Sequence, residues 1–100
     1  MEKRKAHYSL DTLKMLVKRD GLLAFTATAR RGKEALGLSD VEALAVVDAL
    51  SRGMLVKSMT THADTSVWQD VYHAPCPNGK MAYIKLTLRD GVVVIQFKER

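Results

Sequence analysis

The stretch Ser39–Thr61, SDVEALAVVDALSRGMLVKSMTT, contains the change of pattern that decides the fold. Its first part opens with a capping box, because Ser39 is a good N-cap and Glu42 follows three residues later. Apolar residues then recur at helical spacing, and Gly53 lies just past the expected end. We therefore expect a helix at residues 40–51, with an apolar stripe made of Val41, Leu44, Val47 and Leu50. Beyond the glycine the residues favour β-structure.

The chain before this stretch reads mainly as helix. Ser9 is an N-cap candidate, and apolar residues at helical spacing follow it until Gly21 ends the pattern. Residues 22–26 are apolar and partly β-branched, which predicts a short strand. Residues 28–36 predict a brief helix closed by a glycine.

The chain after this stretch reads as antiparallel strands. Pro75–Gly79 and Asp90-Gly91 are turn signals between alternating segments. The expected strands are residues 54–61, 67–73, 81–88 and 92–98. The fold class is therefore α+β, a single domain over residues 1–100 with N-terminal helices packed on one face of a curved, mainly antiparallel sheet. Alternation leaves a polar set for the other face: Lys57, Gln69, Tyr83, Lys85, Gln96 and Lys98.

Composition narrows the class of protein. Residues 1–33 carry nine Lys or Arg and three Asp or Glu, a net +6, within a chain of net charge +5. Such a basic balance favours a polyanionic partner, nucleic acid first. No apolar run reaches the roughly 20 residues that span a bilayer, and no signal-peptide pattern follows the charged amino terminus. A single cysteine, Cys76, excludes an internal disulfide, so we expect a cytoplasmic protein.

Common catalytic patterns are missing from the sequence. The three histidines lie in different segments, Cys76 has no ligand-spaced partner, and no glycine-rich phosphate loop occurs. Lysine, tyrosine and glutamine on strands remain. RNA cleavage can use such residues without a metal, because the ribose 2′-hydroxyl is the nucleophile. The residues alone leave three functions open: an endoribonuclease, a non-catalytic basic RNA- or DNA-binding regulator, and a small interaction module.

Four blocks of sequence carry a resemblance to a known family. They are Met1–Arg4, the KSMTT of Lys57–Thr61, the WQDVY of Trp68–Tyr72 and the FKER of Phe97–Arg100. In this order they resemble the motility-quorum-sensing-regulator (MqsR) family of bacterial toxins over nearly the whole chain. The resemblance implies a RelE-like fold. It also implies a toxin of a type II toxin–antitoxin system, an mRNA interferase that inhibits translation and growth.

The same resemblance implies an activity and partners. Members of the family cut single-stranded mRNA at GC-containing triplets, GCU above all, without a metal, and we expect no cofactor. Their partner is a zinc-containing, DNA-binding antitoxin, through which operator DNA is contacted only indirectly. No membrane partner is expected.

The family's functional positions fall on residues of the expected polar face. Its catalytic lysine, glutamine and tyrosine correspond to Lys57, Gln69 and Tyr83, and we expect RNA binding by Met59, His73, Lys85 and Lys98. Lys57 is expected to act as base or to stabilise charge, Tyr83 as acid or phosphate donor, and Gln69 to orient the RNA. Trp68 has the opposite strand parity to Gln69, so we interpret it as a packing residue.

The chain departs from the family at two positions near these residues. Val56 stands where the family can have an aromatic residue, and His73 stands where it can have an arginine. Residues 22–36 match loosely, so no function is transferred to them. The triplet preference, the assignment of acid and base, and the surface that meets the antitoxin are therefore left open.

Overall fold

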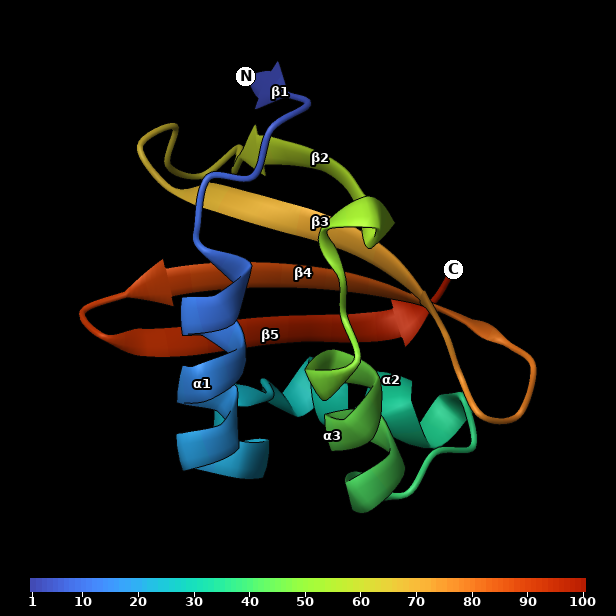
Figure 1. The fold of residues 1–100 in the computed structure, drawn as a ribbon. Coiled ribbons are helices and arrows are strands. Elements are labelled where there is room, and N and C mark those ends of the chain that lie inside the picture. The colour runs from blue at the N-terminus through green and yellow to red at the C-terminus, as the bar shows by residue number, and fades with distance from the viewer.

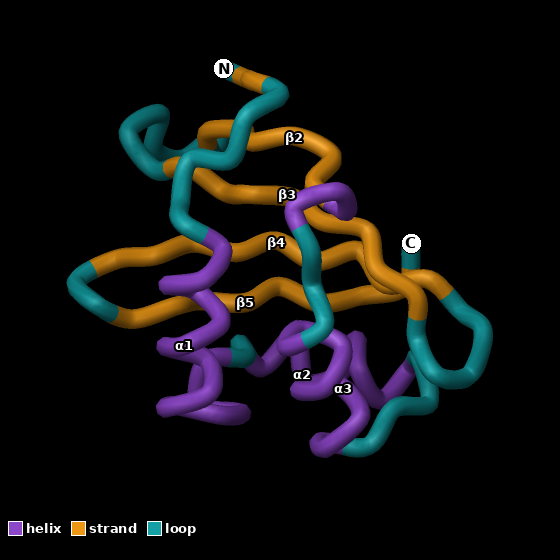
Figure 2. Tube along the Cα trace, in the orientation of Figure 1, coloured by secondary structure: helices purple, strands orange, loops and turns teal.

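A computed structural model describes residues 1–100 as an open, five-stranded antiparallel sheet with three helices (Figure 1). The strands lie in sequence order, β1 to β5, and the helices gather toward the β5 side of the sheet (Figures 1 and 2). The strands are β1 (Glu2–Lys3), β2 (Leu55–Thr60), β3 (Trp68–Pro75), β4 (Met81–Arg89) and β5 (Val92–Glu99). The expected α+β class is confirmed, and no helix is long and apolar enough to cross a membrane.

Each helix begins after a residue whose side chain caps it. Helix α1 (Leu10–Asp20) starts after Ser9, whose hydroxyl accepts the Thr12 N–H. Helix α2 (Ala27–Ala35) starts after Thr26, and α3 (Asp40–Asp48) carries both hydrogen bonds of the expected capping box. Each cap satisfies an N–H group that has no partner inside the helix, which explains why the starts of α1 and α3 are readable from sequence. The cap of α2 was not expected, since Thr26 was placed in a strand.

Two expectations about the helical half are wrong. Residues 22–26 do not form a strand: residues Gly21–Ala24 form a 3-10 helix, and only Phe25 makes an isolated parallel bridge to Ile95. The turn at Gly21 has a positive φ of 57° and sends the chain along the β5 edge, where there is room for one bridge and no ladder.

The second error concerns one end of the apolar stripe of α3. Val47 and Leu50 are buried and Leu44 packs against the core as expected, but Val41 is 78% exposed, and Ala43 and Val46 are buried in its place. Apolar residues surround this helix on nearly all sides, so helical periodicity alone does not choose the side that faces the core. Packing against α1 and the sheet makes that choice.

The strand half agrees with the alternation of the sequence. Ile84, Ile95 and Phe97 point into the core against α1 and α3, and their neighbours in sequence point to the other face. The turn between β4 and β5 has positive φ at both Asp90 and Gly91, as a two-residue hairpin requires. Strand β1 was not expected. It has two residues, too few to show a period, and it pairs with β2 through Glu2–Met59 and Lys3–Ser58.

Helix α2 covers the outer edge of β5 at unusually close range. A Cβ atom on Gly32 would lie 1.9 Å from the carbonyl oxygen of Phe97, so only glycine permits this approach. Thr26, the N-cap of α2, donates its hydroxyl to Gln96 Oε1 at 3.1 Å. The helix therefore protects the edge strand and brings its first turn to the polar side of the sheet.

Candidate functional site

The polar residues expected on one side of the sheet share that side in the structure. We call this surface, defined by Lys57, Gln69, Tyr83, Lys85, Gln96 and Lys98, the polar face. Strand register places Lys57, Val71, Lys85 and Gln96 in one row across β2 to β5. A neighbouring row contains His73, Tyr83 and Lys98. Residues far apart in sequence are thus aligned by the strand pairing alone.

A shallow hollow of about 280 Å³ lies on the polar face. It is lined by Gln69, Tyr83, Lys85, Gln96 and Lys98, with Phe97 and Thr28 of α2 at its border. Four of the residues expected from sequence therefore meet in one concavity. Gln96 and Thr28 were given no role beforehand, and Thr28 reaches the hollow only because Gly32 lets α2 approach β5.

Tyr83 lies between two nitrogen-containing side chains. The centres of the His73 and Tyr83 rings are 5.4 Å apart. Lys98 Nζ lies 5.2 Å from the centre of the Tyr83 ring, which fits a cation–π contact. His73 does not line the hollow itself. Burial, with a smaller effect of Arg100, lowers the pKa of His73 below 6.5, so its imidazole is mainly neutral at pH 7.

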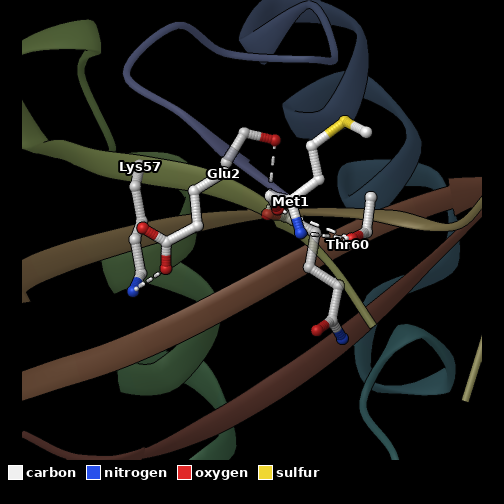
Figure 3. A network of polar contacts seen from close by, with 6 residues as sticks. Met1, Glu2, Lys57 and Thr60 are labelled. Carbon is white, nitrogen blue, oxygen red and sulfur yellow. Dashed lines mark hydrogen bonds and ion pairs between the residues drawn. The ribbon is translucent and has the colours of Figure 1, made fainter. Parts of the chain in front are cut away.

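Lys57 stands beside the hollow and is held by a carboxylate. Its Nζ donates to Glu2 Oε1 at 2.8 Å, and Figure 3 shows the two side chains converging from β1 and β2. This hydrogen bond and the charge of Glu2 raise the pKa of Lys57 above 10.5. Burial and the charge of Arg4 act in the opposite direction but are outweighed by Glu2, so the geometry favours an ammonium that stabilises charge over a neutral lysine that takes a proton.

Val71 gives the polar face an apolar floor. It lies between Lys57 and Lys85 in the register and is 0% exposed, although it points away from the helix-side core. Long lysine stems commonly cover apolar surface in this way while their charged ends stay in water. Met59, opposite Gln69 on β2, is half-buried and lies outside the hollow.

The aromatic residues of β3 belong to the other side of the sheet. Trp68 stacks on His7, with ring centres 5.1 Å apart, and Lys3 Nζ lies 4.3 Å from its centre. Trp68 is thus a packing residue, as expected, although its partner is the segment before α1. Tyr72 lies in the core, where burial raises its pKa to about 12.

Three other concavities contain none of the expected site residues. One, of about 300 Å³, is a mostly apolar groove between α1 and α3. The second, of about 570 Å³, is bordered by Arg4, Lys5 and Arg52 near the start of α1. The third, of about 320 Å³, lies between α3 and the prolines Pro75 and Pro77. No group of three or more His, Cys, Asp or Glu side chains is arranged to hold a metal ion.

Glu2 is the functional neighbour that the sequence did not reveal. Its contact with Lys57 depends on the pairing of β1 with β2, which joins residues 55 positions apart. A two-residue strand has no alternation to detect, so no local signal marked it.

Comparison with known proteins gives two matches. The sequence model of the family described as "Motility quorum-sensing regulator, toxin of MqsA" matches residues 5–99. The protein named mRNA interferase toxin MqsR, from Escherichia coli (strain K12), is 37% identical over 100 residues, which covers 100% of both chains. Both matches span the helices and the whole polar face.

Proposed function

The chain belongs to the family of motility quorum-sensing regulator toxins, and from this premise we propose that it is an mRNA interferase, a toxin that cleaves messenger RNA. The name of its full-length relative supports the activity. The observation on the molecule itself that carries the proposal is the convergence of Gln69, Tyr83 and Lys98 in one hollow, with Lys57 beside it.

We further propose that the cut uses the 2′-hydroxyl of the substrate and residues of the polar face. Lys57 provides a fixed positive charge for the phosphate oxygens as negative charge develops on them. Tyr83 donates to the phosphate or the leaving oxygen, and Gln69 orients the RNA. Lys85, Lys98, His73 and Met59 bind the strand around the scissile bond.

The dimensions of the polar face suit a single strand. Lys57 on β2 and Gln96 on β5 stand at the two ends of one register row, three inter-strand steps or about 14 Å apart. A strand stacked at about 3.4 Å per nucleotide crosses this distance in roughly four nucleotides. That length supports recognition of a triplet, and we propose GC-containing triplets, GCU foremost, as the substrate.

We also propose that the protein works in the cytoplasm with an antitoxin as partner. The family description names the toxin by its relation to MqsA, which supports a dedicated neutralising protein. We propose that this antitoxin contains zinc and binds DNA, so that operator DNA is contacted through it.

The test is cleavage of a defined RNA by the purified protein in EDTA. We expect scission at GCU sites that leaves 5′-hydroxyl ends, and no scission when the nucleotide 5′ of the scissile phosphate carries a 2′-deoxyribose. RNA binding that weakens with salt but is not accompanied by scission would instead assign a non-catalytic regulator. Scission that requires an added divalent metal would contradict the metal-free mechanism.

A further inference from the structure

One carboxylate contacts the lysine that the proposed function places at the reacting phosphate. Glu2 lies opposite Met59 in the β1–β2 pairing, so Glu2 and Lys57 are diagonal neighbours on the same face. Their side chains are 61% and 30% exposed, and the 2.8 Å contact lies at the border of the polar face (Figure 3). The pair is therefore accessible to a bound RNA strand.

Lys57 differs in this respect from the other lysines of the polar face. Neither Lys85 nor Lys98 has a carboxylate within ion-pair distance, and Lys57 does. A lysine on a flexible stem loses rotamer freedom when it is fixed over a phosphate. A partner that fixes it beforehand removes that loss from the reaction. One of the three ammonium protons points at Glu2, which leaves two for phosphate oxygens.

The backbone around Glu2 is anchored on both sides. Before it, the Thr60 N–H donates to the Met1 carbonyl oxygen at 2.9 Å, and the Met1 amino group donates to Thr60 Oγ1 at 3.1 Å (Figure 3). After it, the fully buried Asp70 carboxylate accepts the backbone N–H groups of His7 and Tyr8. Glu2 therefore presents its carboxylate to Lys57 from a held segment.

We propose that Glu2 is a positioning residue for Lys57 and that the anchored segment at residues 1–8 holds Glu2 at the active site. This inference rests on the proposed endoribonuclease function. The carboxylate does not touch the reacting atoms; it orients the Lys57 ammonium toward them. The opposite role, a latch that RNA must displace before Lys57 can act, predicts the opposite change in rate.

The experiment compares wild type with Glu2→Gln, which keeps the size of the side chain and removes its charge. Initial rates of multiple-turnover cleavage are measured in EDTA over a range of RNA concentrations. We expect kcat to fall up to about fivefold, the effect equivalent to an exposed ion pair of ~1 kcal/mol, with KM unchanged or lower. The pKa of Lys57, followed by NMR of its 13Cε, should fall in the same variant.

Two controls separate positioning from other effects. Glu99→Gln removes the same charge from an exposed residue of β5. Glu99 has the opposite strand parity to Lys98 and so does not belong to the polar face, and its substitution should leave kcat unchanged. In a Lys57→Ala background, Glu2→Gln should have no further effect on the residual rate.

Each other outcome has one meaning. An active wild type with an unchanged kcat in Glu2→Gln overturns the positioning role, and a raised kcat assigns Glu2 as a latch. An equal loss in the Lys57→Ala background shows that Glu2 acts through something other than Lys57. If the wild type does not cut RNA, the proposed function itself is wrong. Failure of the positioning role alone would instead leave the wild type active.

Discussion

The buried carboxylate of Asp70 accepts the backbone N–H of Tyr8 at 2.9 Å and thereby ties the segment before α1 to the strand that carries Gln69. Two further hydrogen bonds from the His7 N–H, at 3.0 and 3.1 Å, satisfy the same carboxylate. Asp70 is 0% exposed, so its carboxylate has no access to water as a substitute partner. The cluster links the stability of the amino-terminal segment to the site.

Asp70→Asn should destabilise the protein by about 1–3 kcal/mol, because in either orientation the amide NH2 group faces the backbone N–H of His7 and the charge that strengthens these hydrogen bonds is lost. Urea unfolding gives the free energy, and hydrogen exchange at His7 and Tyr8 should become faster. Asp48→Asn, at an exposed position near the end of α3, should stay within about 0.5 kcal/mol of wild type. A neutral effect of Asp70→Asn would show that the cluster contributes nothing to folding.

Lys57→Ala should reduce kcat by at least ~10²-fold with the fold intact, since it removes the charge proposed to stabilise the phosphate. Cleavage in EDTA gives the rate, and the unfolding curve checks the fold. Lys80→Ala is the matched control, because Lys80 is an exposed lysine in the turn before β4 and outside the hollow. Equal rates for Lys57→Ala and wild type would remove Lys57 from the mechanism.

Lys57→Arg distinguishes a charge-stabilising lysine from a general base. Arginine keeps the positive charge and cannot release a proton near neutral pH, so we expect a rate within about tenfold of wild type. A loss as large as that of Lys57→Ala would indicate a base.

The pKa of Lys57 is raised by Glu2, so this pair stabilises the fold fully below pH 10.5 and less as pH rises through the higher folded pKa. A general base at Lys57 would titrate only in that alkaline range.

RNA affinity should rise between pH 7 and pH 5 because of His73. Its pKa is lowered by burial, so the imidazole is mainly neutral at pH 7 and gains a charge below pH 6.5, where phosphate favours the protonated form. Because the pKa of His73 is lower in the folded protein than in the unfolded chain, the contribution of His73 to folding stability is complete above pH 6.5. This contribution decreases as the pH falls through the folded pKa. Binding of a non-cleavable 2′-deoxy-substituted strand measures the affinity.

The control for this pH effect is a second histidine. His62→Gln, in the exposed loop between β2 and β3, should keep the pH dependence of binding, whereas His73→Gln should flatten it. Identical pH profiles for wild type and His73→Gln would exclude a contact between His73 and the RNA phosphates.

Gly32→Ala should destabilise the protein by about 1–3 kcal/mol, although alanine is the better helix former. The added methyl group would overlap the Phe97 carbonyl, so α2 must move away from β5. Because Thr28 borders the hollow, RNA cleavage should fall as well. Glu34→Ala, on the exposed side of α2, should leave both quantities nearly unchanged. A more stable Gly32→Ala would show that α2 tolerates the displacement.

Local chemistry explains which parts of this fold could be predicted. Ser9, Ser39 and Gly21 act through hydrogen bonds and backbone angles within a few residues, so the starts of α1 and α3 and the end of α1 are readable in the chain. Strand alternation works the same way, because a period of two residues assigns each side chain to a face. Lys57, Gln69, Tyr83 and Lys98 were therefore placed together on the polar face.

Contacts between distant segments decided the rest. The buried side of α3 depended on packing against α1, because its apolar residues surround the helix. Strand β1 and the pairing of Glu2 with Lys57 depended on the anchoring of residues 7 and 8 by Asp70. The sequence by itself determined the caps of α1 and α3, the strands β2 to β5 and the side chains that share the polar face, since these follow from short-range patterns. The roles expected of Lys57, Gln69 and Tyr83 came from the family resemblance. Only the tertiary structure decided the partner of Lys57, because that contact joins residues whose separation carries no local pattern.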